Sequence, residues 1–226
     1  MNTQQLFRKA VMRSAWSFLI VGAILFIAAG SLHYWQAWLF FAVFAVLSAQ
    51  ACRYMLRYAP GLLEKRIGGP LSERSREQRI IQCLSSVFVV CLFALSGRDY
   101  GTHGPRLPWI AVLAADCLVI LGHLLFQAVV RENRFAAATV EVQEEQTVID
   151  TGPYLVVRHP MYTSAILIAL ATPPALASLW GLLPTMPFVA AIIVRLLREE
   201  RYLRNNLPGY EAYCARVRFR LIPQVW

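Results

Sequence analysis

Four stretches of this sequence are almost free of charged residues, and their length restricts what the chain can fold into. No Asp, Glu, Lys or Arg occurs in 14–52, 80–97 or 160–194, and Asp116 is the only such residue in 107–130. Apolar runs of about 18 residues or more with few charges are typical of membrane-spanning helices. In addition, 58% of the residues are hydrophobic and 15% are charged, whereas soluble domains carry roughly 25% charged residues. The sequence therefore predicts an all-α, polytopic integral membrane protein.

The last uncharged run predicts a helical hairpin. Its 35 residues would form one helix of about 52 Å, longer than a hydrocarbon core of about 30 Å. Pro173, Pro174 and the segment 181–187 contain residues that interrupt helices. We thus expect five to six membrane helices, at 14–31, 34–57, 80–97, 108–131, 160–178 and 185–205. They divide the chain into a four-helix membrane region, 1–131, and a cytosol-facing region, 132–226, with the hairpin and an amphipathic tail.

The basic residues are distributed unevenly between the predicted loops. The net charge is +9, and 20 of the 22 Lys and Arg residues fall before residue 14 or within 53–79, 131–158 and 195–220. The predicted helices place these segments on one side of the membrane, which the positive-inside rule makes cytosolic. Both termini are expected there, in a bacterial inner (cytoplasmic) membrane. This pattern orients helices and does not follow a phosphate backbone, so we expect no nucleic-acid partner.

The remaining polar residues in the apolar runs give weaker signals. Asp116, His123 and Gln127 share one face of the helix predicted at 108–131, and ionisable residues inside a span are candidates for function. An interhelical hydrogen-bond ladder explains them equally well. The five cysteines form no CxxC pair and the four histidines have no metal-ligand spacing, so we expect no metal.

A polar cluster is predicted at the cytosolic end of the hairpin. Arg158, His159 and Tyr162 lie where the chain enters the uncharged run, and Arg195 and Glu199, one turn apart, lie where it returns. Taken singly, arginines near helix ends extend to lipid headgroups in many membrane proteins. Taken together, these residues predict a pocket with cationic and anionic walls at the cytosolic face.

Three motifs of the C-terminal part resemble one enzyme family. GPYLVVRHPMY, RLLREERYL and PGYEAYCARVRFRLIP are similar to the isoprenylcysteine carboxyl methyltransferases, which are integral membrane methyltransferases. The wider group includes phospholipid N-methyltransferases and small-thiol S-methyltransferases. The resemblance covers about residues 133–226, and the N-terminal half matches only as a set of apolar helices.

The resemblance implies S-adenosylmethionine as the methyl donor, with S-adenosylhomocysteine as the product. It places Arg158 and Arg195 against the acceptor and gives Glu199 the role of holding Arg195, so these three are the candidate catalytic residues. The residues implied for the cofactor site are Gly152, Pro153, Tyr154, His159, Tyr162, Glu199 and Tyr213. All of them fall in 132–226, so the resemblance implies that this is the cofactor-binding region. The implied partners are membrane lipids and a lipid or small-molecule acceptor.

The reaction favoured by these residues is carboxyl O-methylation. A carboxylate is already ionised at neutral pH, and arginines can hold it through two hydrogen bonds. Phospholipid N-methylation or thiol S-methylation would need a base, for which His159 is the nearby candidate. The alternatives of another class are a non-enzymatic membrane protein and an NADPH-dependent sterol reductase. The reductases carry Arg-His-x-Asn-Tyr where this chain has Arg-His-Pro-Met-Tyr.

Overall fold

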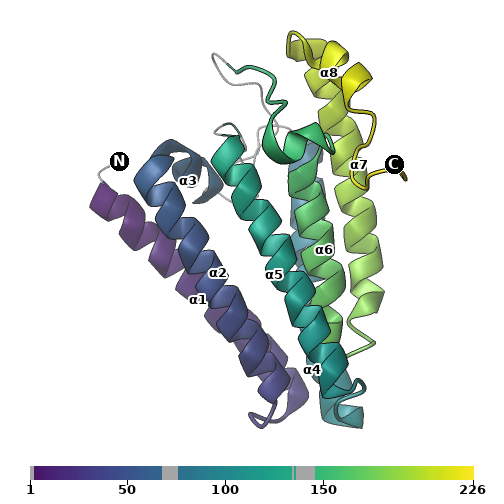
Figure 1. Cartoon of the computed structure of the whole chain (residues 1–226). Helices are drawn as coiled ribbons and strands as arrows, with labels where there is room; N and C mark the ends of the chain where they lie inside the picture. Colours follow the sequence, from purple (N-terminus) through teal and green to yellow (C-terminus); the bar gives the residue numbers. More distant parts are fainter. Residues whose placement is uncertain (1–2, 68–75, 134, 136–145) are drawn as a thin grey trace.

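The protein is helical throughout the part that the structure describes. This structure is a computed structural model, and it describes residues 3–67, 76–133, 135 and 146–226. Within these ranges there is no β-strand, so the predicted all-α class is confirmed. The elements are α1 (Thr3–Ala29), α2 (Trp35–Tyr58), α3 (Pro60–Ile67), α4 (Arg76–His103), α5 (Trp109–Glu132), the 3-10 helix η2 (Gly152–Leu155), α6 (Pro160–Ala175), α7 (Leu182–Asn206) and α8 (Tyr210–Arg216) (Figure 1).

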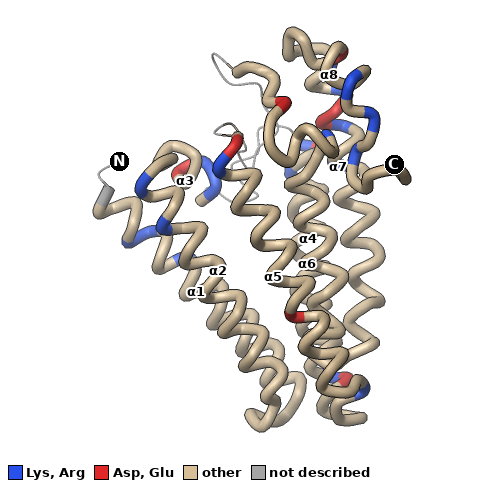
Figure 2. Tube along the Cα trace, in the orientation of Figure 1, with Lys and Arg blue, Asp and Glu red and all other residues tan. Residues whose placement is uncertain are grey.

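Four helices of the described chain are long and apolar enough to cross a membrane, namely α1, α2, α4 and α5. The predicted hairpin is present as α6 and α7, but α6 has 16 residues and α7 carries charges from Arg195 onward. Charged residues gather at the end of the molecule that holds the N-terminus, α3 and α8 (Figure 2). The chain is thus an integral membrane protein, while five to six spans and cytosolic termini remain predictions.

Glycines bring α4 into direct contact with the backbone of α1. A Cβ atom at Gly97 would lie 2.3 Å from the carbonyl oxygen of Leu25, and one at Gly101 would lie 2.6 Å from that of Ala29. Small residues four apart allow this close approach of membrane helices. The predicted end of this helix at residue 97 was therefore wrong. The structure continues it through 98–103, because its glycines serve packing and do not end it.

Asp99 in this added turn fixes the tip of the hairpin. Its buried Oδ2 accepts hydrogen bonds from Ser178 Oγ at 2.8 Å, Leu179 N at 3.0 Å and Trp180 N at 3.1 Å. Its Oδ1 accepts one from Arg106 Nε at 2.8 Å. The turn between α6 and α7 is thereby anchored to the end of α4.

The start of α6 is positioned by α5. These two helices make the most extensive helix–helix contact in the described chain. A Cβ at Gly122 would lie 2.6 Å from Ile168 Cγ1, and Ser164 Oγ donates to the Gly122 carbonyl at 2.8 Å. Helices α1 and α2 diverge from α6 and α7 toward the end where α3 lies (Figure 1). Helix α3, in the segment predicted as a polar loop, packs there through the buried Leu62 and Leu63.

Candidate functional site

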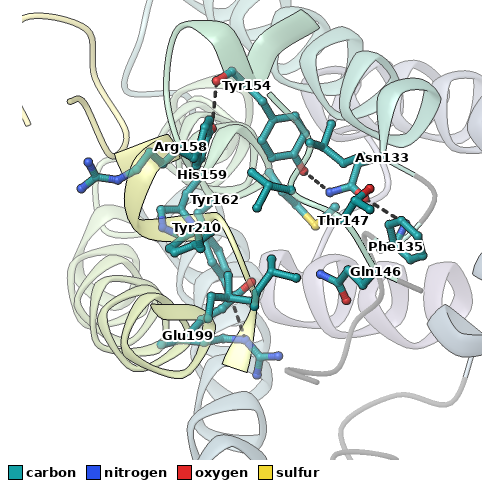
Figure 3. Close-up of a pocket in the computed structure, with 17 residues that line it drawn as sticks. Asn133, Phe135, Gln146, Thr147, Tyr154, Arg158, His159, Tyr162, Glu199 and Tyr210 are labelled. Carbon is teal, nitrogen blue, oxygen red and sulfur yellow. Dashed lines mark hydrogen bonds between the residues drawn. The ribbon is translucent and has the colours of Figure 1, made fainter. Parts of the chain in front are cut away.

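A cavity lies where the start of α6 meets the last turns of α7, α8 and the segment before η2 (Figure 3). Seven of the nine predicted site residues line it: Tyr154, Arg158, His159, Tyr162, Arg195, Glu199 and Tyr213. Lining residues that the sequence analysis did not select are Asn133, Phe135, Gln146, Thr147, Val148, Ile149, Met161, Leu203, Leu207 and Tyr210. The hairpin therefore brings together most of the residues predicted from its two ends.

Tyr162 connects the arginine and the carboxylate of α7. Arg195 Nε donates a hydrogen bond to the Tyr162 hydroxyl at 3.1 Å, and this hydroxyl donates in turn to Glu199 Oε2. Tyr162 enters the cavity from the first turn of α6, and Arg195 and Glu199 are one turn apart on α7. The structure thus links Arg195 to Glu199 through the hydroxyl group of Tyr162.

Glu200, next to Glu199, is the centre of a separate buried ion cluster. Its side chain is 4% exposed and contacts Arg158 Nη2 at 2.9 Å, Arg220 Nε at 2.6 Å and Arg204 Nη2 at 3.3 Å. Consecutive residues of an α-helix point about 100° apart. Glu199 therefore faces the cavity, while Glu200 faces the C-terminal tail.

Arg158 belongs to this ion cluster. Besides Glu200, its guanidinium donates to the carbonyl oxygens of Val217 at 2.9 Å and Arg218 at 3.1 Å. The backbone N–H of Arg158 donates to the Phe219 carbonyl at 2.9 Å. Figure 3 shows the Arg158 side chain directed away from Tyr162. These contacts hold the tail against the start of α6, while the contact of Arg158 with an acceptor, which the resemblance implied, stays a prediction.

His159 presents a buried polar atom at the cavity. It precedes the first residue of α6, and burial lowers its pKa from 6.5 to about 4, although the nearby Glu200 acts in the opposite direction. Among the described residues, neither His159 Nε2 nor the Tyr210 hydroxyl has a hydrogen-bond partner. Buried polar atoms are nearly always satisfied in native proteins, so these two atoms, on residues that line the cavity, are candidates for contacts with a polar ligand.

Gly152 and Pro153 do not line the cavity but form the turn that positions Tyr154. Gly152 has φ = 55°, and a Cβ there would lie 3.0 Å from Glu132 Cδ, so the position favours glycine for both conformation and space. Pro153 opens η2. The carbonyl oxygen of Tyr154 then accepts a hydrogen bond from the Tyr213 hydroxyl at 2.8 Å, which joins η2 to α8.

The wall formed by Asn133 and 146–149 was missed because these residues have no helical periodicity and belong to no motif. Asn133 ends α5, and its Nδ2 donates to the Tyr154 hydroxyl at 2.8 Å. Burial is the main cause that raises the pKa of Tyr154 to about 12. An asparagine directly after a long apolar helix was the one available signal, because this residue type is common at helix ends.

The polar residues of α5 lie away from this cavity. His123 Nδ1 donates to the Val119 carbonyl at 3.0 Å, and its ring packs edge-on against Phe44. Both carboxyl oxygens of Asp116 and the Nε2 atom of Gln127 are buried without a partner in the described part of the chain. The predicted face exists, but none of its three residues lines the cavity.

The comparison with known families bears on the segment that builds this cavity. Residues 110–208 match the phospholipid methyltransferase family. The match begins in α5, includes η2 and the α6–α7 hairpin, and ends before Tyr210 and Tyr213. Because this family includes membrane methyltransferases of the isoprenylcysteine methyltransferase type, the resemblance found in the sequence is confirmed. No curated protein matches the chain significantly. In the described ranges, no group of three or more His, Cys, Asp or Glu could hold a metal ion.

Proposed function

We propose that this protein is an S-adenosylmethionine-dependent membrane methyltransferase whose acceptor is an amphiphile drawn from the bilayer. One observation carries the proposal: the family match and the cavity coincide. Of the described residues that line the cavity, only Tyr210 and Tyr213 lie outside the matched segment 110–208. The part of the chain that is similar to methyltransferases is therefore the part that forms the pocket.

The residues of the cavity fit the proposed cofactor. S-adenosylmethionine supplies an electrophilic methyl group on a sulfonium, and transfer bonds this carbon to the acceptor while the C–S electron pair stays on sulfur. The Glu199 carboxylate and the rings of Tyr154 and Tyr162 suit a cationic ligand. His159 Nε2 and the Tyr210 hydroxyl can form hydrogen bonds with its polar groups.

The proposed acceptor follows from two further cavities on the membrane side of Tyr162. The cavity described above is here called the cofactor cavity. The first of the two further cavities, here called the neck, shares Met161, Tyr162 and Arg195 with it. The neck in turn shares lining residues with a larger cavity, here called the aromatic cavity. Seven phenylalanines line the aromatic cavity: Phe18, Phe40, Phe41, Phe44, Phe88, Phe93 and Phe188. An amphiphile with its chain among these rings would place its head group beside Tyr162 and Arg195.

Within this class we propose carboxyl O-methylation first. A histidine with a pKa of about 4 is a weak base at neutral pH. This favours an acceptor that is already ionised, and Arg195 can pair with such a group. N-methylation of a phospholipid amine is the second candidate, because the matched family is described as a phospholipid methyltransferase family.

Isothermal titration of the detergent-solubilised protein with S-adenosylhomocysteine, and with NADPH in parallel, tests the proposal. We expect micromolar binding of S-adenosylhomocysteine, a loss of at least tenfold in Glu199→Gln, and wild-type affinity in the control Glu64→Gln on α3. NADPH binding in its place would move the protein to the reductases. Binding of neither ligand by folded protein would refute the enzymatic function.

A further inference from the structure

The neck between the cofactor cavity and the aromatic cavity is lined by cationic and uncharged polar side chains. Two arginines line it, Arg195 from α7 and Arg66 from α3, together with the uncharged polar residues Gln82, Ser85 and Ser86 of α4. No acidic residue occurs among the described residues that line it. A guanidinium group has several N–H donors, so two arginines beside one cavity can bind an anion through charge-assisted hydrogen bonds.

The two arginines reach the neck at the same level of α6. Arg195 Nε contacts the Tyr162 hydroxyl at 3.1 Å, and Arg66 Nη1 contacts Sδ of the preceding residue, Met161, at 3.6 Å. The Arg66 guanidinium also lies 4.8 Å from the centre of the Phe126 ring. The two guanidinium groups thus contact neighbouring residues in the first turn of α6, although α3 and α7 are far apart in the sequence.

Helix α3 is built in a way that directs Arg66 inward. Leu62 and Leu63 are buried against α1 and α2, whereas Glu64 and Lys65 are exposed. Arg66 is three residues beyond Leu63, so it returns to the buried face of this amphipathic helix. An arginine on this face, held by aromatic and thioether contacts, differs from the solvent-exposed Arg53 and Arg57 of α2.

We propose that Arg66 and Arg195 together bind the anionic head group of the acceptor, a carboxylate or a phosphate, while its hydrocarbon chain occupies the aromatic cavity. Arg66 thereby takes the position beside the acceptor that the sequence resemblance gave to Arg158, which is engaged by Glu200 and the tail. The assignment of this ligand as the acceptor rests on the proposed methyltransferase function. The binding of an anionic amphiphile does not, and can be measured without methyl transfer.

Native mass spectrometry of the protein released from a neutral detergent measures this binding directly. The probes share one chain length: tetradecanoate, tetradecyl phosphate and the uncharged tetradecanol. We expect at least one of the anions to bind about tenfold more tightly than the alcohol, as for a charge-assisted contact. Arg66→Gln should reduce this preference to less than about threefold, Arg66→Lys should restore part of it, and the control Arg57→Gln should leave it unchanged.

The outcomes separate this proposal from the proposed function. Arg66→Gln should bind S-adenosylhomocysteine with wild-type affinity, because Arg66 does not line the cofactor cavity. A stronger preference for tetradecanoate would indicate a carboxylate head group, and one for tetradecyl phosphate a phospholipid. Equal binding of all three probes to the wild type, or an unchanged preference in Arg66→Gln, would overturn the assignment of Arg66. If the wild type does not bind S-adenosylhomocysteine, only the proposed function is overturned.

Discussion

Two adjacent glutamates of α7 are expected to respond in opposite ways to the same substitution. Glu200→Gln removes the charge that faces Arg158, Arg204 and Arg220. Breaking a buried ion pair by neutralising one partner costs about 3–5 kcal/mol. In the ion pair between Arg158 and Glu200 both side chains are buried. The Arg204 and Arg220 side chains are 38% and 29% exposed, so their pairs with Glu200 contribute as surface ion pairs do. Glutamine also keeps one acceptor oxygen, so we expect a loss of about 3 kcal/mol.

That loss corresponds to a decrease in Tm of about 6–12 °C for a chain of this size. It should be accompanied by release of the tail, because Glu200 joins Arg158 at the start of α6 to Arg220 beyond α8. Trypsin should then cleave at Arg216 and Arg218 faster than in the wild type. Thermal unfolding followed by tryptophan fluorescence in detergent, with timed proteolysis alongside, measures both effects.

Glu199→Gln is the matched control, since it has the same chemistry one residue away. Glutamine can still accept the hydrogen bond from Tyr162, so stability should change by less than about 1 kcal/mol. The affinity for S-adenosylhomocysteine should nevertheless decrease at least tenfold. If the two variants lose stability equally, or if Glu200→Gln has an unchanged Tm, the separation of a ligand-facing and a tail-facing glutamate is refuted.

Three further predictions concern other parts of the fold. Gly97→Ala should destabilise the protein by about 2 kcal/mol or more in thermal unfolding, because the added Cβ would overlap the Leu25 carbonyl. Gly61→Ala is the control and should not destabilise it, because a Cβ at Gly61 would have no neighbouring atom within 4 Å. Asp99→Ala should lower the free energy of unfolding by about 3 kcal/mol, since it removes the acceptor for Ser178, Arg106 and two backbone N–H groups. Asp99→Asn retains one acceptor oxygen and should lower it less, so equal Tm values for the two variants would argue against this anchor. The free energy of unfolding of the wild type should decrease by about 3 kcal/mol as the pH falls from 6.5 to 4, because the unfolded chain binds a proton at His159 that the folded chain does not. His159→Gln should flatten this part of the plot of unfolding free energy against pH, and an unchanged slope would exclude His159 as its source.

The convergence of the two hairpin ends could be predicted from the sequence. The 35-residue uncharged run is too long for one crossing, and its prolines interrupt it, so Tyr162 and Arg195 had to return to a common level. The all-α class followed equally directly from the apolar runs. Both inferences depend on lengths and periodicities, which the sequence contains explicitly.

The orientation of individual side chains could not be predicted in the same way. Helical spacing shows that Arg195 and Glu199 share a face, but it does not show which surface that face meets. The tail decides this: its carbonyl groups and Arg220 engage Arg158 and Glu200, and leave Glu199 to the cavity. Similarly, nothing in the sequence of 58–79 shows that α3 folds back against α1 and α2, so Arg66 was counted only as a loop charge.

The shortness of α6 links the site to the thickness of the bilayer. Its 16 residues span about 24 Å, roughly 6 Å less than the hydrocarbon core. If the hairpin crosses the membrane as predicted, with its turn at the opposite interface, Tyr162 at the floor of the pocket would lie within the hydrocarbon layer. The surrounding lipid would then have to thin, or water would have to enter beside α6. Turnover should therefore increase in bilayers of short-chain lipids, which makes hydrophobic mismatch a determinant of how readily the head group of an acceptor reaches its methyl donor.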